Sequence, residues 1–84
     1  PTANSDAYHL SLRGRFFVNK RTRPDLRKAL HLFEEAVAKD PHYAQAYAAN
    51  AQSWLLLPAY EDSAPKYCFP KAQTAAEKAL ALLG

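Results

Sequence analysis

The stretch "KALHLFEEAVAKDPHYAQAYAANA", residues 28–51, contains two helical patterns joined by an Asp-Pro pair. In the first pattern, apolar residues recur at the i, i+3, i+4, i+7 spacing of an amphipathic helix. Together with Leu26, just before the stretch, these positions are Ala29, Leu30, Phe33, Ala36 and Val37. The spacing predicts a helix over residues 23–39. Asp40 and Pro41 suit a helix cap and a first helical turn, so we expect the next helix to begin there and to reach residue 57.

The flanking segments carry two more helical patterns. Residues 5–19 form the first expected helix, which Asn4 or Ser5 can cap. Thr22, three residues before Asp25, resembles a capping box for the helix over residues 23–39. After the loop "PAYEDSAP", residues 66–83 form the fourth expected helix, with Pro70 near its start. The sequence therefore predicts an all-α fold of four antiparallel helices.

Each expected helix has an apolar stripe that we expect to be buried. In residues 5–19 the stripe consists of Leu10, Gly14, Phe17 and Val18. In the third helix it consists of Ala44, Tyr47, Ala48, Ala51, Trp54 and Leu55. In the fourth helix it consists of Ala72, Ala75, Ala76, Ala79, Leu80 and Leu83. The abundance of alanine favours closely packed helices.

The two halves of the chain align with each other. When Ala7 is placed on Ala44, Gly14 falls on Ala51 and Phe17 on Trp54. When Lys28 is placed on Lys71, three further pairs align, namely Ala29 with Ala72, Glu34 with Glu77, and Ala36 with Ala79. We therefore expect one domain over residues 1–84, made of two stacked helix-turn-helix units. The first unit covers residues 5–40 and the second covers residues 41–84.

At these positions the sequence resembles the tetratricopeptide repeat family, whose repeats combine small and aromatic residues in a helix-turn-helix unit. The residues that match, and that we expect to pack within and between repeats, are Gly14, Phe17, Ala29, Phe33, Ala36, Tyr47, Ala51, Trp54, Ala72 and Ala79. Two positions depart from the pattern: Ala76 replaces an aromatic residue and Gly84 replaces the final proline. Both turns are also longer than in the family. The resemblance implies a fragment of an α-solenoid, packed in the same way.

A narrower likeness is to repeats in large bacterial regulators, where they follow adenylate cyclase, kinase or winged-helix DNA-binding modules. It rests on "GRFFVNKRT", the Asp-Pro turn and "FPKA". This likeness implies a cytoplasmic scaffolding module that binds proteins within a larger regulatory or signalling protein. Two repeats are fewer than the three usually needed for a stable stack. We therefore expect either further repeats in a longer parent chain or a homo-oligomer through the fourth helix, where Ala76, Leu80 and Leu83 lack cover. The alternative is a purely structural spacer.

Composition excludes several classes of protein. Of the 84 residues, 49% are hydrophobic and 23% are charged, which is the balance of a globular domain. No apolar run approaches the roughly 20 residues that span a bilayer, so we expect no membrane segment. Cys68 is the single cysteine, which rules out an internal disulfide and fits a reducing compartment.

No group of residues predicts catalysis. His9, His31 and His42 lack the spacing of metal ligands, and Cys68 has no nearby base in the sequence. Glu34 and Glu35 are adjacent, and adjacent residues point apart on a helix. With only two glycines in the chain there is no Gly-rich phosphate loop. We therefore expect no enzymatic activity, no cofactor and no metal.

The resemblance implies a peptide-binding groove. In the family, the first helices of successive repeats line a concave surface that binds extended or helical peptides. The matching positions here are Tyr8, Ser11, Leu12, Arg15, Gln45 and Gln52, with Ala48 and Ala49 between them. The expected partner is a protein or a peptide. Ordinary solvent exposure is the alternative explanation for Tyr8, Gln45 and Gln52.

A basic segment surrounds the first turn. Lys20, Arg21 and Arg23 occupy the turn itself, and Arg13, Arg15, Arg27 and Lys28 lie on the adjoining helices. Cations near a helix end complement its dipole and keep a repeat surface hydrated. The alternative is a docking site for an acidic peptide or a phosphate. An accessory surface for nucleic acid is a weaker form of this alternative, because the turn has no interleaved aromatic residues and the net charge is only +3.

Overall fold

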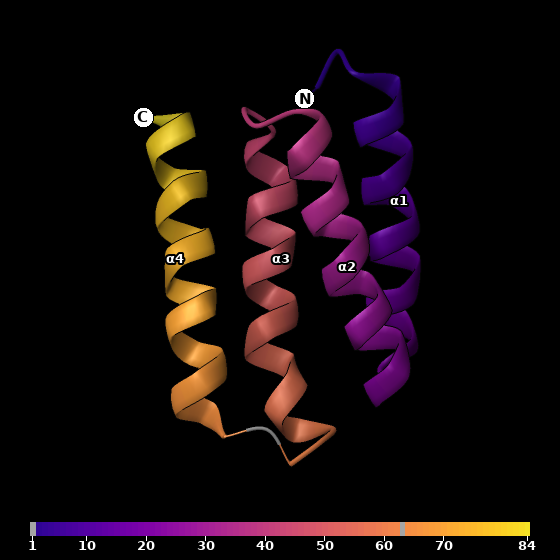
Figure 1. Ribbon diagram of the computed structural model, residues 1–84, viewed down its shortest axis with the longest axis vertical. Helices are drawn as coiled ribbons and strands as arrows, with labels where there is room; N and C mark the ends of the chain where they lie inside the picture. Colours follow the sequence, from indigo (N-terminus) through magenta and orange to yellow (C-terminus); the bar gives the residue numbers. More distant parts are fainter. Residues whose placement is uncertain (1, 63) are drawn as a thin grey trace.

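The computed structural model describes residues 2–62 and 64–84, and all of its regular structure is helical (Figure 1). The elements are α1 (Ser5–Lys20), α2 (Arg23–Lys39), α3 (Ala44–Leu56), the short 3-10 turn η1 (Leu57–Ala59) and α4 (Pro65–Leu83). The described residues include no strand. This confirms the all-α prediction.

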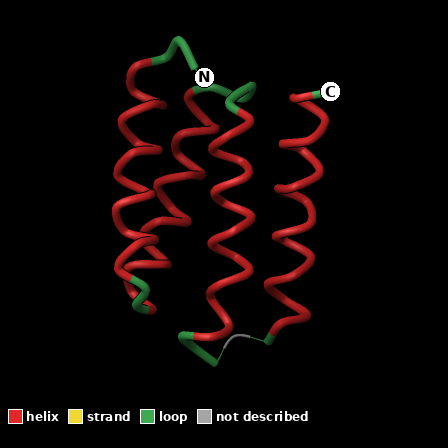
Figure 2. The backbone as a smooth tube through the Cα atoms, turned by 180° about the vertical axis from the view of Figure 1, so that it is seen from behind, coloured by secondary structure: helices red, strands yellow, loops and turns green. Residues whose placement is uncertain are grey.

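The helices form two hairpins, α1–α2 and α3–α4, which contact each other through α2 and α3. α1 packs closely on α2, α3 packs closely on α4, and α2 joins the hairpins by packing on α3. Successive helices run in opposite directions, with α3 between α2 and α4 (Figure 1); the rear view shows the same arrangement (Figure 2). α1 and α3 touch only slightly, and the described backbones of α2 and α4 do not approach each other closely. The two-hairpin fold is therefore confirmed. It leaves space between α1 and α3 and between α2 and α4, since the members of each pair do not pack closely on each other.

Side-chain caps define both helices of the first hairpin. The Asn4 side chain accepts a hydrogen bond of 3.0 Å from the Ala7 N–H, which starts α1. Thr22 accepts one of 3.3 Å from the Asp25 N–H, and its hydroxyl donates to the Asp25 carboxylate over 2.7 Å. Both expected caps are confirmed. Between the helices, Arg21 ends α1 in the left-handed region at φ 54°.

The start of the third helix differs from the sequence prediction. α3 begins at Ala44 rather than at Pro41, because Asp40 serves the turn and not the new helix. The Asp40 N–H donates to the Ala36 carbonyl over 3.0 Å, and its carboxylate accepts from the His42 N–H over 3.0 Å. The Thr2 hydroxyl also donates to this carboxylate. That bond, with the His42 bond second, lowers the pKa of Asp40.

Phe33 occupies the centre of the core, opposite Gly14. The Phe33 ring is fully buried, and a Cβ placed on Gly14 would come within 2.5 Å of it. Only glycine therefore lets α1 approach the ring this closely. The main cluster continues into the second hairpin and comprises Val18, Leu26, Ala29, Leu30, Phe33, Trp54, Leu57, Cys68 and Ala72.

The buried stripes of α3 and α4 differ in part from the predicted ones. Leu55 is 55% exposed, whereas Ser53 is buried, and its hydroxyl is satisfied by donating to the Ala49 carbonyl over 2.8 Å. In α4, Cys68 is buried, but Leu80 and Leu83 are 67% and 73% exposed. These two leucines belong to the predicted apolar stripe but are not buried in the described chain, as the expected lack of cover in a two-repeat chain implies, because no described element packs against the far side of α4.

Contacts at the entry to α4 involve residues of both hairpins. Arg27 of α2 donates to the Glu61 carboxylate with its Nε at 3.0 Å and also with a terminal nitrogen. Tyr67 packs edge-to-face on Trp54, with ring centroids 5.9 Å apart. Pro70 lies inside α4, where Thr74 donates its hydroxyl to the Pro70 carbonyl over 3.0 Å.

Candidate functional site

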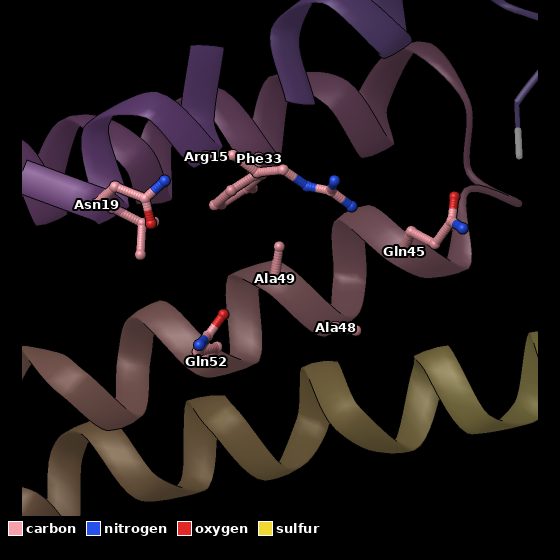
Figure 3. A pocket seen from close by; sticks show the side chains of 8 residues that line it. Arg15, Asn19, Phe33, Gln45, Ala48, Ala49 and Gln52 are labelled. Carbon is pink, nitrogen blue, oxygen red and sulfur yellow. The ribbon is translucent and has the colours of Figure 1, made fainter. Parts of the chain in front are cut away.

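An open hollow of about 400 Å³ lies between α1 and α3 (Figure 3). Arg15 and Asn19 reach it from α1, and Gln45 and Gln52 from α3. Phe33 of α2 also lines the hollow. The complete lining is Arg15, Val18, Asn19, Phe33, Gln45, Ala48, Ala49 and Gln52.

A second hollow of about 270 Å³ adjoins the first towards the start of α1. Arg15 and Gln45 line both, so we treat the two as one surface, the α1–α3 groove. The lining of this second part is Thr2, Tyr8, Ser11, Leu12, Arg15, Tyr43 and Gln45. All six residues that the sequence assigned to a peptide groove line one or both of these hollows.

Helical spacing explains why these residues line one surface. Leu12, Arg15 and Asn19 follow one another at three- and four-residue intervals on α1, which places them on a single face. Gln45 and Gln52 are seven residues apart on α3, two helical turns along its axis. Ala48 and Ala49 lie between them, and their short side chains leave the surface of α3 open there. α2 separates the two walls because it packs against both helices.

Ser11 has a different environment from the other predicted groove residues. It is 1% exposed, and its hydroxyl has no hydrogen-bond partner among the described residues. Ser11 therefore belongs to the floor of the groove, whereas Tyr8 and Leu12 beside it are 48% and 43% exposed. Sequence reasoning treated all three as surface contacts because they share the first helix.

The groove provides the chemistry of recognition. Arg15 supplies a cation, and the side-chain amides of Asn19, Gln45 and Gln52 can each donate and accept hydrogen bonds. Such amides suit the N–H and C=O groups of a peptide backbone. Among residues 2–62 and 64–84, no cluster of three or more His, Cys, Asp or Glu side chains is placed to hold a metal ion.

Five lining residues were not assigned to the groove from the sequence, namely Thr2, Val18, Asn19, Phe33 and Tyr43. Asn19 lies one helical turn after Arg15, so extending the α1 series by four residues would have found it. Tyr43 was missed because the sequence placed residues 41–43 inside a helix; it is instead the residue before α3 and is 4% exposed.

The basic turn lies apart from the groove. The Lys20 ammonium is 4.8 Å from the centroid of the Phe16 ring, and Lys28 is 4.6 Å from that of Phe17. Arg23 borders a separate hollow with Arg27 and Glu61. The hydrogen bond to Glu61 raises the pKa of Arg27. Several of the basic side chains are thus already engaged within the chain.

Comparisons with known proteins provide no relative. No family model, no curated protein and no solved structure matches the chain. In the part of the chain that the structure describes, no helix has the length and apolar character required to cross a membrane.

Proposed function

We propose that this chain is a protein-interaction module that binds a peptide segment of its partner in the α1–α3 groove. The observation that carries the proposal is the convergence of residues from two helices, distant in sequence, on one open surface. That surface combines a cation, several amides and the exposed rings and aliphatic groups of Tyr8 and Leu12. We expect the peptide to carry an acidic residue opposite Arg15.

We place this module among the tetratricopeptide-like repeats. Two observations support this assignment: the hairpins pack as the repeat pattern predicts, and the Phe33 ring lies against the small residue Gly14. In this proposal the module is a cytoplasmic scaffold of a larger bacterial regulatory or signalling protein and has no enzymatic activity of its own.

A selected peptide tests the groove directly. We would display random twelve-residue peptides on phage, select binders to the chain, and map one synthetic binder by NMR on the ¹⁵N-labelled protein. We expect the largest chemical-shift changes at the backbone amides of Arg15, Gln45 and Gln52 and at the side-chain amides of the two glutamines. Arg15→Glu should weaken the binder about tenfold, because it replaces an attraction by a repulsion.

Arg13→Glu is the matched control. Arg13 lies on the same helix but borders a hollow with Glu35 and Lys39, away from the groove. It makes the same change in net charge, so the binder should keep its affinity for this variant. Selected binders that shift only residues outside the groove would contradict the proposal.

Self-association through α4 is the second candidate function. The observation that favours it is the exposure of Leu80 and Leu83 at 67% and 73%, side by side on the outer face. Sedimentation equilibrium tests it: a dimer that Leu80→Glu converts to a monomer would support it, and a monomer at all concentrations would exclude it.

A basic accessory surface for phosphate or nucleic acid has less support. Lys20, Lys28 and Arg27 already contact aromatic rings or a carboxylate within the chain. Salt-sensitive DNA binding that is lost in Arg21→Glu and Arg23→Glu would restore this alternative.

A further inference from the structure

Another hollow, of about 550 Å³, lies between α2 and α4 with α3 as its floor. We call it the α2–α4 groove. It shares no lining residue with the α1–α3 groove. It exists because α2 and α4 both pack on α3 and do not approach each other closely in the described chain, as the separation of the two helices in Figure 1 indicates.

The floor and walls of the α2–α4 groove are largely apolar. Val37 comes from α2, Tyr47 and Trp54 from α3, and Pro70 and Ala75 from α4. A volume of this size matches the concave sites that bind small molecules or individual side chains. The apolar lining is therefore suited to an aliphatic or aromatic group.

The polar atoms around this apolar floor are mostly donors. Asn50 lines the groove from α3, and its Nδ2 is enclosed without a hydrogen-bond partner among the described residues. Lys71 and Lys78 border the groove from α4, and the Lys71 ammonium lies 5.7 Å from the Trp54 ring centroid. Glu34, on α2, is the acidic side chain in the lining. The α4 side is thus positive and complements an occupant with acceptor groups.

The spacing of the two lysines indicates the form of that occupant. Seven helical residues separate Lys71 from Lys78, about 10 Å along α4. Three residues of a polyproline II segment cover about 9 Å and bring the first and fourth side chains to the same side, because this conformation has three residues per turn. A peptide in this extended conformation can therefore place an acidic residue near each lysine, with its apolar side chains directed to the other sides of the segment and a backbone carbonyl near Asn50.

We infer that the α2–α4 groove binds an extended segment of a partner protein in which two acidic residues flank a pair of apolar ones. The apolar side chains lie over Trp54 and Val37, and the carboxylates pair with Lys71 and Lys78. This site is separate from the proposed peptide groove and extends the interaction surface to the opposite side of α3.

The chain contains its own reporter for this site, since Trp54 is its only tryptophan. The probe is the acetylated tetrapeptide amide Asp-Leu-Leu-Asp. We expect a saturable change in Trp54 fluorescence and a shift of the Asn50 side-chain amide signals in NMR. The peptides Asp-Gly-Gly-Asp and Lys-Leu-Leu-Lys, tested in the same way, should bind at least about tenfold more weakly.

Matched lysine variants separate charge pairing from general attraction. Lys78→Glu should weaken the tetrapeptide about tenfold, while Lys66→Glu, at an exposed lysine outside the groove, should leave its affinity unchanged. Arg15→Glu should also have no effect, so this test and that of the α1–α3 groove can fail independently. Equal binding of the lysine peptide, no saturable signal with the acidic peptide, or insensitivity to Lys78→Glu would each overturn the inference.

Discussion

The two hairpins follow the same sequence pattern but fill their cores differently. In the α1–α2 hairpin, Gly14 leaves a gap that the Phe33 ring fills completely. The positions that align with these two in the α3–α4 hairpin hold Ala51 and Ala76, and Ala76 is half-buried. The second hairpin instead places its large rings, Trp54 and Tyr67, edge-to-face near the entry to α4.

The N-termini of the helices also differ between the two hairpins. Asn4 and Thr22 cap α1 and α2 with side-chain hydrogen bonds, whereas Tyr43 and Ala64, before α3 and α4, make none. A side-chain cap stabilises a helix by about 1 kcal/mol. The comparison indicates that local sequence specifies the first hairpin more fully, while the second depends more on packing against its neighbour.

Removal of the Phe33 ring should have the largest effect on stability among the changes that test this difference between the hairpins. Phe33→Ala should lower the free energy of unfolding by about 3–5 kcal/mol, because it leaves a cavity against α1. The aligned change in the other hairpin, Ala76→Gly, should cost only about 1 kcal/mol in helix propensity. Urea denaturation followed by circular dichroism measures both. Equal midpoints for the two variants would refute the asymmetry.

Adding a methyl group at Gly14 should lower the free energy of unfolding less than removing the Phe33 ring does. Gly14→Ala should destabilise the chain by about 1–3 kcal/mol, because the new methyl group overlaps the buried Phe33 ring. Helix propensity alone would predict a gain of about 1 kcal/mol, so the sign of the change identifies the cause.

A second substitution tests that explanation. Phe33→Leu should make Gly14→Ala less harmful, because the ring that clashes is gone, and a double-mutant cycle measures the coupling. Independent, additive effects of the two substitutions would contradict direct contact as the cause.

The caps allow the comparison to be sharpened in both directions. Asn4→Ala and Thr22→Ala should each lower the free energy of unfolding by about 1 kcal/mol. Ala64→Asp should raise it by about 0.5–1 kcal/mol, because a carboxylate before Pro65 can accept from an unpaired N–H of the first turn. Thermal unfolding of the three variants measures these shifts. An Ala64→Asp protein no more stable than the parent would show that this helix start does not limit the second hairpin.

The smallest effect concerns the joint between the hairpins. Hydrogen bonds lower the pKa of Asp40 below its ordinary value of 3.8, so its ionised form favours the folded state. This contribution is complete above the unfolded pKa and is lost as pH falls through the lower folded pKa. The urea midpoint should therefore decline below about pH 4, and less steeply in Asp40→Asn. Parallel pH profiles for the two proteins would exclude a contribution from Asp40.

Much of the fold is accessible to sequence reasoning because it depends on local rules. The bounds of α2 follow from Thr22, the apolar spacing and Asp40, and the structure gives the same residues, Arg23–Lys39. The start of α3 does not follow, because Asp40 is bonded by Thr2, which is distant in sequence. Ser53 and Leu55 show the same limit: which face of α3 is buried depends on where α2 and α4 lie.

The two grooves likewise have features that follow from the sequence and features that do not. The positions of Arg15, Gln45 and Gln52 follow from helix periodicity together with the repeat pattern, and the structure brings them onto one surface. The burial of Ser11 and the α2–α4 groove depend on distances between helices, which periodicity does not determine. The unpartnered Asn50 amide likewise has no signal in the sequence, since an asparagine on a helix is usually hydrated.

The contacts of Thr2 and Asn4 have a topological consequence. Thr2 bonds Asp40, and the Asn4 side chain donates to the Lys39 carbonyl over 3.2 Å. The chain therefore leaves the first hairpin beside the point at which it entered. A hairpin with adjacent ends is a nearly closed module, so we expect a second copy of residues 2–40 spliced in after Asp40 to lengthen the stack without redirecting the chain that follows.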